Sequence, residues 1–201
     1  MAEQATQENV VDLLLAQHEE IRHLASTVEK NHGKVRKDAF DRLRRLLAVH
    51  ETAEEEVVHP FARRAAADGS RVVDARLEEE NKAKGVLSDL EKMDPESADF
   101  VETFARFHRD LEAHASHEEK EEFPRIAREA TPEQMRGMAK AVRAAEAIAP
   151  THPHQGTESP TKNLAVGPMA AVADRVRDAI GKARLTARGG PPGRPSFEEV
   201  R

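Results

Sequence analysis

One stretch of the sequence occurs twice and decides the fold. It reads HETAEEEVVHP over residues 50–60 and HASHEEKEEFP over residues 114–124. Both copies fit the pattern HxxxEExxxxP, in which a histidine precedes a glutamate by four residues. Residues four apart lie about 40° from each other on a helix, so each pair can bind one metal centre from one face. The two pairs are His50 with Glu54 and His114 with Glu118.

The residues around each pair place it on the apolar side of a helix. The first pair falls within the series Leu43, Leu46, Leu47, Ala53, Val57, Val58 and Phe61, and the second continues the series Phe104, Phe107 and Leu111. Burying ionised glutamate and histidine among aliphatic side chains costs several kcal/mol each unless cations compensate. Exposed pairs within one helix are the plain alternative, but the apolar stripe favours an inward metal site.

Working outward, apolar residues recur at helical spacing in five segments. These segments cover about residues 7–29, 37–66, 71–93, 98–130 and 131–149. The fifth opens with a capping box, Thr131 to Gln134, and has Pro132 at its first position. Four long helices with short connections imply antiparallel neighbours. The predicted fold class is therefore all-α, an up-down-up-down four-helix bundle with additional C-terminal helices.

The domain organisation follows from a change of composition after Pro150. We expect the bundle, including its fifth helix, to occupy residues 1–150. The segment 151–167 is rich in proline, glycine and polar residues and indicates a linker. Residues 168–185 predict a short amphipathic helix, and residues 186–201 predict a disordered tail.

The first and third helices supply further candidate ligands. His18 continues the inward series of the first helix, whereas the third helix contains no histidine and brings Glu80 to the corresponding level. Asn81 is the weaker candidate there, and Glu51, His117 and Glu121 remain open as additional ligands. We expect His23, His32, His59 and His108 to face solvent. The predicted metal ligands are His18, His50, Glu54, Glu80, His114 and Glu118.

This donor set indicates the kind of metal. Three imidazoles and three carboxylates without a thiolate suit iron or manganese, and two carboxylates placed to bridge suggest two ions. The chain contains no cysteine, which excludes a disulfide scaffold, thiolate zinc and iron–sulfur clusters. A net charge of −6 argues against nucleic-acid binding. No apolar run is long enough to span a bilayer, and the N-terminus does not resemble an export signal. We therefore expect a cytoplasmic protein that contacts no membrane. We also expect it to be a monomer or a homodimer.

A lone histidine in the first helix with HxxxE in the second and fourth resembles the hemerythrin-like HHE cation-binding family, over about residues 7–150. Residues 163–178 are similar to the C-terminal extension of actinobacterial members. The resemblance implies a non-haem di-iron centre, oxo- or hydroxo-bridged, flanked by Glu54 and Glu118. It matches His18, His50 and His114 to family ligands, and manganese or zinc could substitute for iron. Members of this family bind dioxygen, sense oxygen or iron, handle nitric oxide or break down peroxide.

The third helix departs from the oxygen-carrier pattern, because respiratory hemerythrins have two histidines there. Glu80 would add negative charge, stabilise ferric iron and weaken reversible dioxygen binding. We therefore expect the chain to handle small oxidants (peroxide, dioxygen or nitric oxide), which includes a catalase-like, peroxide-consuming activity. The alternatives are an iron or oxygen sensor, or a reversible dioxygen binder, without catalysis. Ferritin-like iron oxidation or storage would use Glu20–His23 and Glu56–His59, which the helical angle places off the inward stripes.

Overall fold

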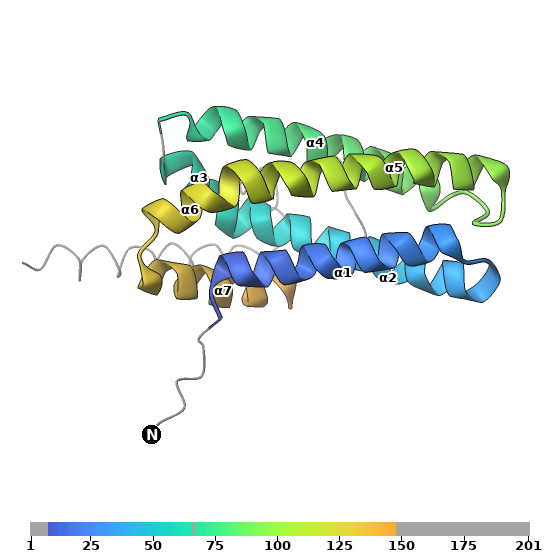
Figure 1. The fold of residues 1–201 in the computed structure, drawn as a ribbon, viewed down its shortest axis with the longest axis horizontal. Coiled ribbons are helices and arrows are strands. Elements are labelled where there is room, and N and C mark those ends of the chain that lie inside the picture. Colours follow the sequence, from blue (N-terminus) through green and yellow to red (C-terminus); the bar gives the residue numbers. More distant parts are fainter. Residues whose placement is uncertain (1–7, 66, 148–201) are drawn as a thin grey trace, which may run out of the picture.

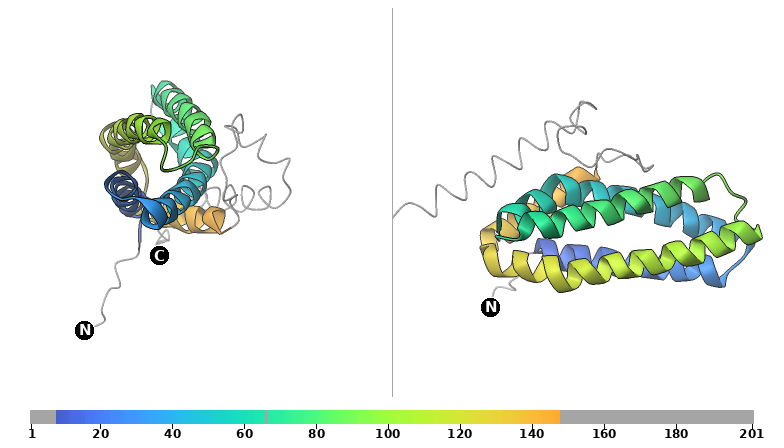
Figure 2. Two further views of the ribbon diagram at one scale, coloured as in Figure 1. Left: turned by 90° about the vertical axis from the view of Figure 1, so that its right-hand side faces the viewer. Right: turned by 90° about the horizontal axis from the view of Figure 1, so that it is seen from above.

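The computed structural model describes residues 8–65 and 67–147, which form a bundle of antiparallel helices (Figure 1). The helices are α1 (Val10–Lys30), α2 (Gly33–Ala53), α3 (His59–Ala65), α4 (Gly69–Leu90), α5 (Ala98–His117), α6 (Phe123–Glu129) and α7 (Pro132–Glu146). Two π-helical turns, η1 (Glu54–Val58) and η2 (Glu118–Glu122), join α2 to α3 and α5 to α6. The end-on view of Figure 2 shows α1, α2, α4 and α5 around one axis. The predicted all-α bundle is confirmed, while the predicted segments at 151–167, 168–185 and 186–201 lie outside the described residues.

Local capping explains where the helices begin. Asn9 accepts hydrogen bonds from the backbone N–H groups of Val11 and Asp12 at the start of α1. The predicted capping box of α7 is present, with Thr131 and Gln134 bonding each other's backbone N–H groups. Helix α2 begins earlier than predicted, because Gly33 adopts a φ of 57° and turns the chain directly after α1.

The two π-helical turns occupy the same place in the two copies of the repeated motif. In each, the N–H of the residue after the turn bonds a carbonyl five residues back: His59 to Glu54, and Phe123 to Glu118. Pro60 and Pro124 follow directly. Proline has no N–H and clashes with the carbonyl four residues before it, so a wider turn relieves an α-helix at this point. Each turn inserts one residue and rotates everything after it relative to a continuous α-helix.

Two apolar clusters fill the bundle and leave a polar layer between them. One cluster contains Phe40, Phe100, Phe104 and Phe107 together with Leu43, Leu47 and Leu87. The other contains Leu13, Leu14, Val57, Val58, Phe123 and Ile126, and α7 contributes Met138 and Val142 to it. Helix α7 packs against α1 and α2 on the outside of the bundle that α1, α2, α4 and α5 form (Figure 1). Among the described residues, no helix has the length and apolar character required to cross a bilayer.

Two glycines give a matched test of the packing between α3 and α4. A Cβ on Gly69 would lie 2.3 Å from the carbonyl oxygen of Ala62, whereas a Cβ on Gly137 in α7 would meet nothing within 4 Å. Gly69→Ala should lower the free energy of unfolding by about 1–3 kcal/mol through overpacking. Gly137→Ala should raise it by about 0.5–1 kcal/mol, because alanine is the better helix former. Chemical denaturation of both variants checks the prediction, and equal signs would contradict it.

Candidate metal centre

All six predicted ligands lie in the polar layer, arranged as two donor groups that share two carboxylates. Within each group the donor atoms lie within 4.8 Å of one another. Position A consists of His18 and His50 with Glu54 and Glu118; position B consists of Glu80 and His114 with the same Glu54 and Glu118. Two neighbouring positions that share two carboxylates are the geometry expected of a bridged pair of ions.

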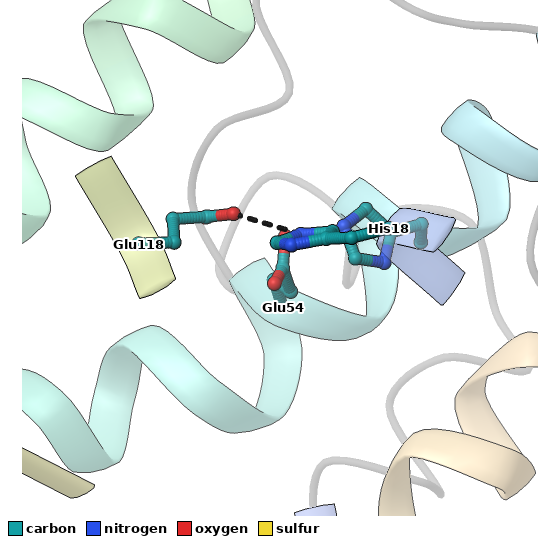
Figure 3. Close-up of side chains that lie close together, drawn as sticks. His18, Glu54 and Glu118 are labelled. Atoms are coloured by element: carbon teal, nitrogen blue, oxygen red, sulfur yellow. Dashed lines mark ion pairs between the residues drawn. The ribbon is translucent and has the colours of Figure 1, made fainter. Parts of the chain in front are cut away.

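Position A is enclosed on all sides. His18 and His50 are 2% exposed, and Glu54 and Glu118 are fully buried. The Nε2 atom of His18 lies 3.2 Å from Glu118 Oε2, and Nε2 of His50 lies 3.3 Å from Glu54 Oε2. Figure 3 shows the Glu118 carboxylate directed at His18, with Glu54 beside the ring. The Phe123 ring stacks on His18 with its centroid 5.5 Å away, which closes this side of the site.

Position B is more acidic and slightly more open. Glu80 is fully buried, and His114 is 13% exposed by its side chain. His114 Nε2 lies 3.4 Å from Glu118 Oε1, the oxygen that does not face His18. One carboxylate therefore presents a different oxygen to a histidine of each position, as a bridging ligand does.

The unsatisfied polar atoms of the interior fit a metal site. Buried groups without a hydrogen bond are rare in native proteins and call for an explanation. Among the described residues, the buried atoms without a hydrogen-bond partner include His18 Nε2, His114 Nε2, Glu80 Oε2 and both carboxylate oxygens of Glu54 and Glu118. These atoms converge on positions A and B, and bound cations would satisfy them together. The donor set, imidazole and carboxylate without sulfur, suits iron or manganese.

The far side of each histidine ring is held by a hydrogen bond. His18 Nδ1 lies 2.9 Å from Glu119, His50 Nδ1 lies 2.8 Å from Gln17, and His114 Nδ1 lies 3.0 Å from Glu79. Such bonds fix the tautomer, so that Nε2 is the free nitrogen that faces the centre. Each of these partner residues is also the neighbour in sequence of another predicted ligand. Gln17 and Glu79 precede His18 and Glu80, whereas Glu119 follows Glu118.

The pKa values of the candidate ligands show how costly it is to bury these side chains when no metal is bound. Burial, and the charge of Glu118 next to it, raise the pKa of Glu54 well above its usual range. Burial, with His18 adding to it, lowers the pKa of His50 to about 3, so this ring is neutral and ready to bind a metal. Burial alone would lower the pKa of His114, but Glu118 raises it to about 9. A metal ion in position B would replace the proton on His114.

His59 is the residue that the sequence analysis placed wrongly. It was predicted to face solvent, but the His59 side chain is only 2% exposed. A continuous α-helix would turn His59 away from the bundle axis, but the extra residue of η1 turns it inward. His59 Nε2 lies 2.6 Å from Glu80 and its Nδ1 lies 2.9 Å from Glu122. Burial would lower the pKa of His59, yet Glu122 and Glu80 raise it well above its usual value.

A buried cation beside position B was also missed. Lys84, one helical turn after Glu80, is 5% exposed. Its Nζ atom pairs with Glu55 and lies 3.9 Å from Glu51. Burial raises the pKa of Glu51 to about 8 and that of Glu55 to about 7, although Lys84 opposes both shifts. The only sequence signal for Lys84 was a lysine within the inward register of the third helix.

The remaining candidates lie outside the two donor groups. Glu80 rather than Asn81 belongs to position B. Glu51 is directed at Lys84, and His117 bonds Glu79 at 3.0 Å. Glu121 is exposed, as are His23 and His32, whereas His108 is only partly buried. Whether the six grouped residues bind metal stays a prediction.

Comparison with known proteins identifies the class. The family model described as the hemerythrin HHE cation binding domain matches residues 9–126. This chain therefore belongs to the hemerythrin HHE cation-binding family, and the buried His/Glu cluster is a candidate site for its cation.

Two relatives agree with this assignment. An uncharacterized hemerythrin-like protein of Schizosaccharomyces pombe is 25% identical over 138 residues, which cover 68% of each chain. The crystal structure of a hemerythrin HHE cation binding domain-containing protein from Mycobacterium kansasii superimposes with a TM-score of 0.61 at 19% identity. That match covers 84% of this chain and 99% of the other, and it supports the fold.

Proposed function

We propose that this protein holds two iron ions at positions A and B and uses them to consume a small oxidant, for which peroxide is the first candidate. The observation that carries the proposal is the pair of donor groups joined by Glu54 and Glu118, whose carboxylate oxygens have no other hydrogen-bond partner in the described part of the chain. Two irons held there would supply the two electrons that reduce one peroxide to water and would regain them from a second peroxide, which leaves as dioxygen.

The residues of the chain divide this work among them. Glu54 and Glu118 would hold the two ions at a fixed separation, and His18, His50 and His114 would bind through Nε2. Glu80 makes position B anionic, which favours the ferric state over a reversible dioxygen complex. His59 lies between Glu80 and Glu122 and keeps a proton next to Glu80. Phe123 and the apolar clusters exclude water from the enclosed side.

The test is peroxide consumption by iron-loaded protein. We expect the loaded protein to show near-ultraviolet charge-transfer bands and to deplete hydrogen peroxide, with dioxygen released. The variant His50→Ala/His114→Ala should lose at least about a hundredfold in rate, because both ions lose an imidazole ligand. His32→Ala is the matched control, since His32 is 79% exposed and distant in the chain from every ligand.

Two results would contradict the proposal. One is a loaded protein that leaves peroxide intact. The other is a reduced protein that forms a long-lived dioxygen adduct and releases the gas under vacuum, which would favour reversible binding. Zinc-loaded protein serves as the redox-inactive reference, because zinc does not change oxidation state.

A further inference from the structure

The two metal positions differ in the donors that they do not share. Position A adds two neutral imidazoles, His18 and His50, to the common carboxylates. Position B adds one imidazole, His114, and one carboxylate, Glu80. The bundle thus offers a nitrogen-richer and an oxygen-richer position side by side, because Glu80 gives position B one more carboxylate among its donors.

The surroundings of position A are close to neutral. The outer partner of His50 is the uncharged Gln17, whose amide nitrogen in turn donates to Glu146 of α7. The outer partner of His18 is Glu119, and Arg22 lies 2.9 Å from the same carboxylate oxygen. Each acceptor behind an imidazole of position A is therefore either uncharged or paired with a cation.

The surroundings of position B contain both acidic and basic groups. The carboxyl groups of Glu51 and Glu55 are buried, and Lys84, one helical turn after Glu80, faces both. Behind His114 stands Glu79, which also bonds His117 and pairs with Arg76 at 3.0 Å. Position B is thus richer in oxygen donors than position A, while cations offset the acidic groups around both positions, since His59 lies 2.6 Å from Glu80.

Ligand type governs which ion a site prefers. Imidazole suits zinc and iron(II), whereas carboxylate suits manganese and other harder ions, and all such sites bind zinc more tightly than manganese in general. Replacing an imidazole by a carboxylate therefore reduces the preference of a site for zinc over manganese. The position with one imidazole should discriminate less against manganese than the position with two.

We propose that positions A and B bind divalent metals in a fixed order and with unequal selectivity. Position A fills first and takes the ion that prefers nitrogen, zinc or iron(II), and position B accepts manganese, so that the chain holds a mixed pair when both ions are present. This inference rests on the bridged pair of the proposed function but not on its reaction. It concerns which ion lies next to which residues.

The order of filling is tested on the full metal-free chain by calorimetric titration with zinc. Two steps are expected, with dissociation constants that differ by at least about tenfold, or 1.4 kcal/mol. Two indistinguishable steps would overturn the order of filling. Because zinc is redox-inactive, this readout stands whether or not the iron-loaded protein consumes peroxide.

The placement is tested by loading one equivalent of zinc followed by manganese. Electron paramagnetic resonance should report one uncoupled manganese ion per chain. Anomalous diffraction at the two metal edges should place zinc beside His18 and His50 and manganese beside Glu80 and His114. Zinc and manganese scrambled over both positions, or exchanged between them, would overturn the proposal.

A variant makes the two positions alike. Glu80→His gives position B two imidazoles. The two zinc dissociation constants of this variant should therefore converge to within about threefold, and zinc should displace manganese from position B. Glu102→His, on a 75% exposed side chain outside both donor groups, is the control and should leave the wild-type steps unchanged. Unchanged steps in a folded Glu80→His variant would count against the proposal, and the diffraction experiment decides on wild-type protein if that variant does not fold.

Discussion

Replacing Glu54 by leucine should remove both metal ions and make the metal-free protein more stable. Glu54, the first residue of η1, is the residue of the α2–η1 segment that belongs to both donor groups. It is fully buried, and neither carboxylate oxygen has a hydrogen-bond partner among the described residues. Leucine has a similar volume and no charge. A buried polar group without a hydrogen bond costs about 1–3 kcal/mol, and we expect Glu54→Leu to raise the free energy of unfolding by a value in that range.

The loss of metal should appear as a loss of stabilisation. A ligand at a hundredfold excess over its dissociation constant stabilises the native state by about 2.7 kcal/mol. Wild-type protein should gain at least that much from iron or zinc, and Glu54→Leu should gain almost nothing. Denaturant unfolding of both proteins, with and without metal, measures both effects, and elemental analysis gives the metal content.

The control for this prediction is a glutamate that is not buried. Glu102 in α5 is 75% exposed and pairs with Arg106 across one helical turn. Glu102→Leu should change neither metal content nor the free energy of unfolding by more than about 0.5 kcal/mol. A Glu54→Leu protein that keeps wild-type metal content would show that Glu54 is not a bridging ligand.

The sequence predicted most of the fold because each local signal agreed with the others. The apolar stripes, the turns at Asn31–Gly33 and Asp68–Ser70, and the capping box at Thr131 all point to the same helices. A fold can be predicted from its sequence when the local preferences agree with the global structure. The register also held up to the first glutamate of each motif. His50 precedes η1 and Glu54 is its first residue, so the helical angle of about 100° per residue still applied to them.

The prediction for His59 failed for a physical reason. A π-helical turn leaves no mark in the hydrophobic periodicity except a proline a few residues later, which also ends helices. His59 is therefore buried where a continuous α-helix would expose it, whereas Val57, Val58 and Phe61 are buried as predicted. Lys84 was missed for another reason: its burial depends on Glu51 and Glu55 of a different helix, and no pattern within α4 encodes that contact.

Lys84→Met should destabilise the protein far more than Arg22→Met, although the two cations occupy corresponding places. Each lies four residues after a donor, Glu80 or His18, and each pairs with the glutamate that follows a bridging carboxylate. Lys84 is 5% exposed, whereas the Arg22 side chain is 32% exposed. Removing one partner of a buried charge pair costs about 3–5 kcal/mol. Removing an exposed one costs less than about 1 kcal/mol.

The pH dependence gives this prediction a signature that general loss of packing lacks. Burial raises the pKa of Glu51 to about 8 and of Glu55 to about 7, above their usual value of 4.5. A carboxyl whose pKa is raised on folding contributes stability below its unfolded pKa and loses it as the pH rises through the folded value. The difference between wild type and Lys84→Met should therefore be small at about pH 5 and grow toward about pH 8.

A second substitution should restore part of the loss, which separates charge from packing. Adding Glu55→Gln to Lys84→Met removes one of the two carboxylates that face the missing ammonium group. The double variant should recover stability at about pH 8 and change little at about pH 5, because Glu55 is already protonated there. Denaturant unfolding of the metal-free proteins at both pH values measures this. A loss that is equal for Lys84 and Arg22, or independent of pH, would mean that Lys84 does not neutralise the acidic side of position B.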